Sequence, residues 1–169
     1  MKNANDIILR FDLQPHPEGG HYREMHRSPH SVLSHRHGAA RSAYTSIYFL
    51  LPPGGFSAWH RITSDETWFH HAGGDVLIFY FDALGSLQTV TLGPESGHMQ
   101  FTVPANTWFA ARPADPNAFT FVSCVVGPGF EFTDFELASR EALRAEFGTI
   151  PDTSMRSRLT AASASGPKR

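Results

Sequence analysis

The sequence predicts a mainly β protein, built as a sandwich or a barrel. Short segments rich in β-branched and aromatic residues follow one another at roughly 8–12-residue spacing, and clusters of turn residues separate them. Helical periodicity is confined to two short segments near the ends. The length of 169 residues suits about one domain. Fourteen glycines and twelve prolines are too many for a helix bundle and too few for a disordered chain.

The N-terminal part of the chain predicts one helix, one strand and one loop. Residues 4–13 carry apolar side chains at helical spacing, with Asn3 or Asn5 as the N-cap, and two prolines follow. A pair of glycines then leads into a first strand at 22–25. Residues 28–40 are polar and without pattern, so we expect a long surface loop there.

The remainder of the chain predicts a run of strands and a single helix. Strands are expected at 44–51, 56–62, 66–72, 76–82, 86–92, 99–103, 107–111 and 118–126, with a further extended aromatic segment at 130–135. The helix that follows has Ser139 as its N-cap and Gly148 just beyond its end. Residues 161–169 have nothing to bury and are expected to be disordered.

Charge and cysteine content limit the classes of function. Fourteen basic and sixteen acidic residues give a net charge of −2, which disfavours nucleic-acid binding. No apolar run approaches the roughly 18 residues that span a bilayer, and the N-terminus lacks the apolar core of a signal peptide. Cys124 is the only cysteine, which excludes an intrachain disulfide, and we expect it to be buried and unreactive. We therefore expect a soluble cytoplasmic protein.

Histidine is unusually frequent, and one histidine-containing segment has a recognisable spacing. Residues 54–73 read GGFSAWHRITSDETWFHHAG. This segment resembles the first motif of the cupin superfamily, G-x5-H-x-H-x3-E-x6-G, with His60 and Glu66 in place and Ile62 at the second histidine. A weaker likeness to the second cupin motif covers residues 97–109 and puts Phe109 at its histidine.

Most of the chain has a closer resemblance, to the cupin 5 family. The matching segments are HPEGGHYRE (16–24), WHRITSDETWFHHAGGD (59–75), VPANTWFAA (103–111) and VVGPGFEFTDFEL (125–137). His21, Asn106 and the order Phe69-His70 depart from the usual family pattern. The resemblance implies a double-stranded β-helix, or jelly roll, as a single cupin domain over residues 1–160, usually in a homodimer. It implies no settled reaction.

A metal centre is one possibility for this site. Metal-binding cupins hold their ion with three histidines and one glutamate, of which only His60 and Glu66 remain. Strand alternation puts Glu66, Trp68 and His70 on one face, so His60, Glu66 and His70 could form a set of two histidines and a carboxylate. His70 lies about 13 Å along the strand from Glu66, which strains a shared ion. We therefore expect no cofactor and keep a divalent metal as the alternative.

Metal-independent acid–base chemistry is the second possibility. A carboxylate beside an imidazole orients the ring and raises its pKa, which suits a general base. Sugar-nucleotide 3,5-epimerases are distantly similar jelly rolls that use a histidine base, a carboxylate and a tyrosine acid. By this analogy His60 would be the base, Glu66 would orient it, and Tyr44 or Tyr48 would donate a proton. The structural alternative is a hydrogen-bonded pair without chemistry.

Other residues are candidates for ligand contact. Arg23 and Arg41 could each bind a carboxylate or phosphate, or form an ion pair on the surface or in a dimer interface. Trp68 and Trp108 could stack on a ring of the ligand or belong to the core. His70 shares the expected inner face with Glu66.

Two further polar residues are assigned structural positions. Glu18 is expected to cap the turn before the Gly19-Gly20 pair. Ser57 differs in parity from His60, so it should point away from the interior unless the strand bulges.

Three functions remain open at this point. The first is a metal-independent, isomerase- or epimerase-like enzyme that acts on a small polar anionic molecule, such as a sugar or nucleotide derivative. The second is a metal-dependent cupin enzyme that uses His60, Glu66 and His70. The third is a non-catalytic protein that binds a small molecule in the barrel.

Overall fold

A computed structural model describes residues 3–34 and 38–148, and the expected tail at 161–169 lies outside the described residues. The strands and helices appear along the chain as α1 (Ala4–Phe11), β1 (Gln14–Pro15), β2 (His21–Arg27), β3 (Ser31–Ser34), β4 (Ala39–Ser42), β5 (Thr45–Leu51), β6 (Ser57–Ile62), β7 (Asp65–Gly73), β8 (Val76–Phe81), β9 (Leu87–Leu92), β10 (Gln100–Val103), β11 (Phe109–Pro113), β12 (Thr120–Gly127), η1 (Phe132–Asp134), β13 (Phe135–Leu137) and α2 (Arg140–Phe147). None of the described helices is long and apolar enough to cross a membrane.

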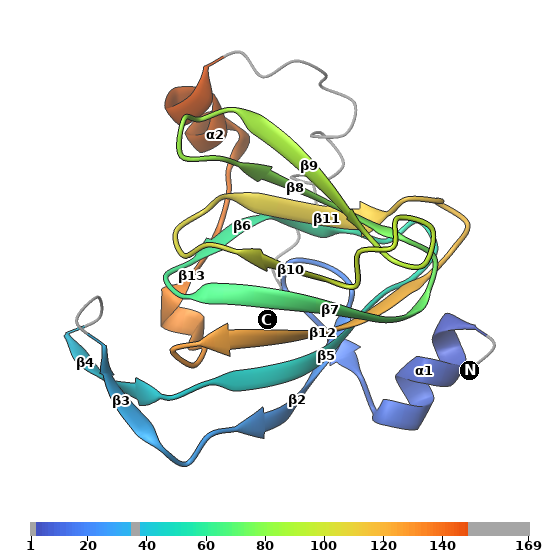
Figure 1. The fold of residues 1–169 in the computed structure, drawn as a ribbon, viewed down its shortest axis with the longest axis horizontal. Helices are drawn as coiled ribbons and strands as arrows, with labels where there is room; N and C mark the ends of the chain where they lie inside the picture. Colours follow the sequence, from blue (N-terminus) through green and yellow to red (C-terminus); the bar gives the residue numbers. More distant parts are fainter. Residues whose placement is uncertain (1–2, 35–37, 149–169) are drawn as a thin grey trace, which may run out of the picture.

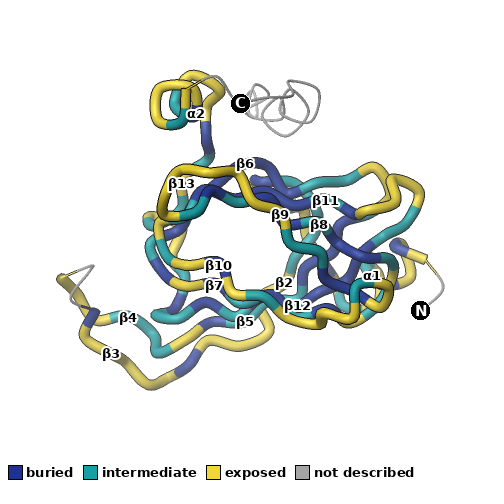
Figure 2. Tube along the Cα trace, turned by 45° about the horizontal axis from the view of Figure 1, so that its top comes forward, coloured by how far each residue is buried: buried dark blue, intermediate teal, exposed yellow. Residues whose placement is uncertain are grey.

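Two antiparallel sheets form the body of the molecule (Figures 1 and 2). One has the strand order β1-β2-β5-β12-β7-β10, and the other has the order β13-β6-β11-β8-β9. Strands that are distant in sequence alternate across both sheets, as in a jelly roll. The predicted all-β jelly-roll barrel is therefore confirmed.

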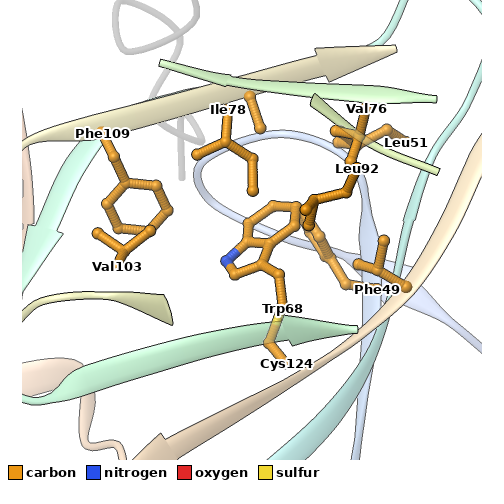
Figure 3. Packing of buried hydrophobic residues seen from close by; sticks show 11 residues of the cluster. Phe49, Leu51, Trp68, Val76, Ile78, Leu92, Val103, Phe109 and Cys124 are labelled. Carbon is orange, nitrogen blue, oxygen red and sulfur yellow. The ribbon is translucent and has the colours of Figure 1, made fainter. Parts of the chain in front are cut away.

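The space between the two sheets is filled by large apolar side chains. Trp68 is fully buried, and its ring meets Phe49 at a centroid distance of 5.6 Å and Phe109 at 6.3 Å (Figure 3). Val76, Ile78 and Leu92 from the second sheet complete this core, and each is fully buried. The core occupies one part of the interior, which leaves the part near the ends of β2, β5, β6 and β12 for a cavity.

The two helices cover the outer faces of the sheets. α1 begins at Asn3, whose side chain accepts from the Asp6 amide, and it buries Ile7 against the sheet. α2 begins at the predicted cap, Ser139, and buries Leu143. Its Phe147 ring stacks on Phe81 at 3.8 Å. Both helices therefore stabilise the barrel without entering it.

Residues 28–40 differ from the expected surface loop. β3 and β4 pair as a hairpin, with Ser31 opposite Ser42 and Ser34 opposite Ala39. Figure 2 shows this hairpin projecting beyond β2 and β5. Most of its residues are exposed, so the hydrophobic alternation that normally identifies a half-buried strand is absent from the sequence.

Candidate functional site

A cavity of about 330 Å³ opens at one end of the barrel. Its deep part is lined by Glu18, His60, Glu66 and Cys124, each less than a tenth exposed. Its outer part is lined by more exposed residues of β2 and of the segment that follows β12. The cavity thus joins a buried polar floor to a mouth at the surface.

His60 is placed in the cavity by β6 and is 2% exposed. Its Nδ1 lies 2.7 Å from the carbonyl oxygen of Ala58. A carbonyl only accepts, so Nδ1 carries the proton and donates it there. The lone pair of the neutral ring is consequently on Nε2, which faces Glu18 Oε2 at 3.3 Å.

Glu18 is the polar residue that sequence reasoning placed in a structural turn. Its Oε1 accepts from Ser57 Oγ at 2.8 Å, and its Oε2 faces both His60 and, at 3.4 Å, His16 Nδ1. Burial raises the pKa of Glu18 to about 8, although the Ser57 hydrogen bond lowers it. Glu18 is therefore a neutral acid at pH 7, and its proton can lie between Oε2 and the Nε2 lone pair of His60.

The glycine pair after Glu18 makes this approach possible. Gly19 has a φ of +106°, and a Cβ there would lie 2.2 Å from the carbonyl oxygen of Phe56. The Glu18 carbonyl in turn accepts from the Ala58 amide at 2.7 Å. Glycine after Glu18 therefore allows the turn at residues 16–20 to lie directly against β6. The Glu18 carboxyl group reaches the cavity floor as a result.

Ser57 shares the inner face of β6 with His60 because β6 contains a bulge. Opposite β11, Phe109 pairs with His60 and Ala111 pairs with Ser57, so three steps on β6 match two steps on β11. The extra residue restores Ser57 to the face of His60, and Ser57 is fully buried. The sequence predicts an outward orientation of Ser57 unless the strand bulges, and this bulge accounts for its inward orientation.

Glu66 lies on β7 and also lines the cavity. Burial raises its pKa to about 7, while the nearby His60 and the Cys124 thiol lower it. The charge of Glu66 acts to raise the pKa of His60, but the oxygen that directly faces the imidazole belongs to Glu18. Burial lowers the pKa of His60, so this ring is neutral beside two buried carboxyl groups.

His16 completes the polar floor. Its Nδ1 accepts from the Glu18 amide at 3.3 Å. Burial, together with the neighbouring His60, lowers the pKa of His16 to about 3. A neutral His16 ring packs edge-on against Tyr22, with a centroid distance of 4.5 Å. Sequence reasoning missed this residue, although it begins the HPEGG segment.

Several predicted contact residues lie outside the cavity. Thr45, Ile47 and Phe49 of β5 face it, so Tyr44 and Tyr48 have the opposite parity. Tyr44 is 43% exposed and lies beside the ring of His26, with centroids 5.4 Å apart.

The predicted tryptophans and His70 are likewise placed elsewhere. Trp108 packs on the outer face of its sheet, and its Nε1 donates to Glu146 at 2.9 Å. Trp68 belongs to the apolar core. His70 lies farther along β7, where its Nε2 donates to the Gly74 carbonyl at 3.1 Å. None of the three is among the residues that line the cavity.

The two candidate arginines have different environments. Arg23 lines the mouth of the cavity and is half exposed, with a 3.7 Å contact to Asp12 and a hydrogen bond to the Phe11 carbonyl. Arg41 lies outside the cavity lining and donates from two nitrogens to Asp134, at 3.2 and 3.3 Å. Arg23 is thus the one of the two that a ligand in this cavity can reach.

The residues present do not fit a metal ion. Ile62 and Phe109 occupy two of the four positions that hold the metal in metal-binding cupins, and the Phe109 ring lies 4.1 Å from that of His60. The third candidate ligand, His70, does not line the cavity. Within residues 3–34 and 38–148, no group of three or more histidine, cysteine, aspartate or glutamate side chains could hold an ion. The chemistry considered below therefore involves only side chains of this protein.

Comparison with known proteins agrees with this architecture. A family model described as "Cupin superfamily (DUF985)" matches residues 5–138. A hypothetical protein from Leishmania major has 34% identity, with 94% of this chain and 99% of that chain covered and a TM-score of 0.83. A protein from Shewanella oneidensis has 37% identity, with 95% and 98% covered and a TM-score of 0.79.

More distant structures share the fold alone. Oxalate decarboxylase from Bacillus subtilis has 15% identity, with 83% of this chain and 35% of that chain covered and a TM-score of 0.55. One structure of that enzyme is described with Mn(II) centres. A search of curated proteins found no match. The family match and the two near full-length relatives establish that this chain belongs to the cupin 5 family of the cupin superfamily.

Proposed function

We propose that this protein is a metal-independent acid–base enzyme of the isomerase or epimerase type. The observation that carries the proposal is the contact of 3.3 Å between His60 Nε2 and Glu18 Oε2 in a buried cavity. Burial lowers the pKa of His60 and raises that of Glu18 to about 8, so both groups are neutral at pH 7. One then offers a lone pair and the other a proton, which is the pairing that proton transfer requires.

The reaction that this pairing supports is the removal of a proton from the carbon next to a carbonyl group. His60 Nε2 takes the proton from carbon, and the C–H electron pair forms the carbon–carbon double bond of an enediol. Glu18 gives its proton to the carbonyl oxygen as the C=O π bond breaks. His60 then delivers its proton to the former carbonyl carbon of the enediol, and Glu18 takes the proton of the other hydroxyl group as the new C=O bond forms, which gives the isomer and restores both groups. Glu18 thus takes the role that the sequence suggested for Tyr44.

The charges around the cavity support a ligand with an uncharged reacting part. Its lining carboxylic residues are Asp12, Glu18, Glu24, Glu66 and Glu131, and its lining arginines are Arg23 and Arg27. Carboxyl groups on the floor disfavour a buried anion. A single anionic group of the ligand would therefore lie at the mouth, beside Arg23, as in a small sugar or nucleotide derivative. The volume of about 330 Å³ is at the lower end for ligand sites.

The experiment that tests this function measures hydrogen exchange into the substrate. Keto sugars, sugar nucleotides and small keto acids are incubated with the protein in heavy water, and proton NMR follows the signal next to each carbonyl. Loss of that signal for one compound class is the expected result. Binding without exchange across the panel would overturn the proposed enzyme and leave a small-molecule binding protein.

We also propose that the protein forms a homodimer through the corner made by β2, the β3–β4 hairpin and the start of β5. Apolar side chains are exposed there: Met25 by 46%, Val32 by 38%, Leu33 by 70% and Tyr44 by 43%. Exposed apolar clusters of this kind support association.

Replacement of Leu33 by glutamate is expected to shift the protein from dimer to monomer, because it puts a charge in place of the most exposed apolar side chain of this surface. Light scattering after size-exclusion chromatography measures the mass. Leu84, 91% exposed in the turn after β8, provides the matched control, and Leu84→Glu should leave the mass unchanged. A monomeric wild-type protein, or a dimer that survives Leu33→Glu, would contradict the proposed interface.

A further inference from the structure

One wall of the cavity is formed by a short segment that we name the aromatic strap, residues 129–137. The rings of Phe130, Phe132 and Phe135 all line the cavity. Phe135 faces His60 with a centroid distance of 5.5 Å, and Phe132 stacks on His16 at 6.0 Å. Phe132 is also 52% exposed. At this point the strap therefore separates the polar floor from solvent.

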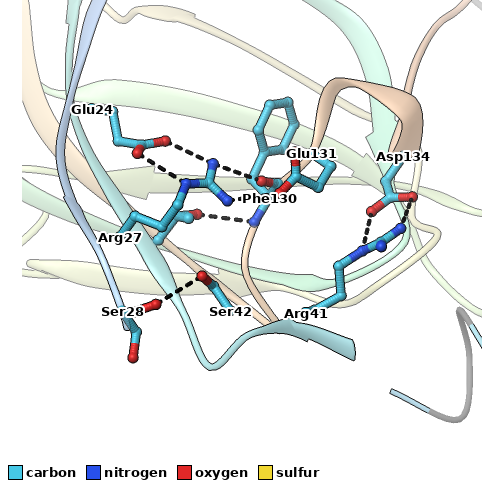
Figure 4. A network of polar contacts seen from close by, with 9 residues as sticks. Glu24, Arg27, Ser28, Arg41, Ser42, Phe130, Glu131 and Asp134 are labelled. Atoms are coloured by element: carbon cyan, nitrogen blue, oxygen red, sulfur yellow. Dashed lines mark hydrogen bonds and ion pairs between the residues drawn. The ribbon is translucent and has the colours of Figure 1, made fainter. Parts of the chain in front are cut away.

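Arginines of β2 and β4 hold the strap on the two sides of Phe132, and Arg61 of β6 pairs with Glu136 near its C-terminal end at 2.8 Å. Arg27, at the end of β2, donates to Glu131 Oε1 at 2.8 Å and to the Phe130 carbonyl at 3.0 Å (Figure 4). Glu24 fixes the same guanidinium through contacts of 3.1 and 2.9 Å. Arg41, on β4, donates two hydrogen bonds to Asp134 (Figure 4). The strap is thus attached by charged contacts on both sides of Phe132.

Apolar burial contributes little at the centre of the strap. η1, at the centre of the strap, has no buried residue, and Glu131 is exposed. Backbone contacts occur at its two ends, where the Gly129 amide donates to Ser42 and β13 pairs with β6. A segment with few buried apolar contacts opens at lower free energy than the whole fold. Ion pairs that are partly exposed are also weakened by salt.

We propose that Arg27 and Arg41 latch the aromatic strap over the cavity, and that release of these ion pairs admits the ligand while the barrel stays folded. Arg27 and Arg23 lie four residues apart on β2, yet they differ in role. Arg27 is bound to two carboxylates and a carbonyl, whereas Arg23 has one long ion-pair contact and one hydrogen bond to a carbonyl. This inference concerns access to the cavity and does not depend on the proposed proton transfer.

The single cysteine provides a reporter for strap opening. Cys124 is 1% exposed and lines the cavity floor. Its modification can be followed with a small uncharged reagent, methyl methanethiosulfonate, and with a larger uncharged disulfide, dithiodipyridine. Burial raises the pKa of the Cys124 thiol, so both reagents are compared at one mildly alkaline pH. The rate of modification by the larger reagent should depend more strongly on opening of the strap.

Arg27→Gln, alone and with Arg41→Gln, is expected to raise the rate with dithiodipyridine about 5- to 30-fold, the factor for one to two kcal/mol of opening free energy. Added salt should raise the wild-type rate and leave the double variant nearly unchanged. Arg144→Gln is the control, because Arg144 is exposed on α2 and lies outside both the strap and the cavity lining. Its rate should equal that of the wild type.

Two results would overturn the latch. In the first, Arg27→Gln and the double variant react no faster than Arg144→Gln. In the second, their faster reaction shows the urea dependence of global unfolding, which exposes far more surface than movement of the strap. A weak urea dependence together with the expected rate increase supports local opening.

Discussion

In the hydrogen-exchange assay, His60→Gln is expected to lower the catalysed rate about 10²- to 10⁴-fold, which is the usual contribution of a general acid–base group. Glutamine can still donate a hydrogen bond to the Ala58 carbonyl, which His60 Nδ1 approaches at 2.7 Å. It has no nitrogen lone pair able to take a proton from carbon. The variant therefore removes the proposed base while it retains a polar side chain of similar size.

His71→Gln is the matched control for this substitution. His71 is exposed on β7, where its Nε2 lies 2.8 Å from Ser123 Oγ, and it does not line the cavity. Its exchange rate should equal that of the wild type. Near-ultraviolet circular dichroism checks that both variants keep the native packing. A folded His60→Gln protein with the wild-type rate would exclude His60 as the base.

The mainly β class was predictable because its signals are local and repeated, whereas the jelly-roll topology was implied by the resemblance to the cupin family. Alternating apolar residues, turn residues between strands and the spacing of His60 and Glu66 each involve fewer than about ten neighbouring residues. The β3–β4 hairpin escaped prediction for the corresponding reason. Most of its side chains are exposed, so no face of the hairpin has a hydrophobic pattern.

The site was only partly predictable because two of its contacts depend on distant segments. The motif spacing singled out His60 and Glu66 as a candidate site, and both line the cavity. Glu18 reaches His60 only after the turn at 16–20 packs against β6, and no local pattern specifies that approach. Ser57 depends on a bulge that becomes visible only in the register between β6 and β11. Parity along β5 would have removed Tyr44 once the inner face was known.

Glu18→Gln is expected to remove most of the loss of stability that the wild-type protein shows between pH 6.5 and 8. Glu18 has a pKa of about 8 in the folded protein and 4.5 as its ordinary value. Between these values the folded state holds a proton that the unfolded chain has lost. Its stabilising contribution is therefore fully present below pH 4.5 and is lost as the pH rises to about 8.

Glu66 has a pKa of about 7, so its contribution to stability is also lost as the pH rises. This loss is complete at a lower pH than that of Glu18. His16 acts in the opposite direction. Its folded pKa of about 3 lies below the ordinary 6.5, so its contribution is present above pH 6.5 and is lost as the pH falls toward 3. The interval from pH 6.5 to 8 therefore reports mainly on the two glutamates. Together they should lower the free energy of unfolding by about 2 kcal/mol, most of it from Glu18.

Urea unfolding at the two pH values measures this difference, and glutamine is the appropriate replacement. Its amide oxygen can accept from Ser57 and its nitrogen can donate to His60 Nε2, which reproduces the contacts of the neutral acid. Glu95→Gln, at an exposed position between β9 and β10, should retain the full wild-type dependence. If Glu18→Gln also retained it, Glu18 would already be ionised at pH 6.5. His60 would then face a carboxylate, and the proposed proton donor would be absent.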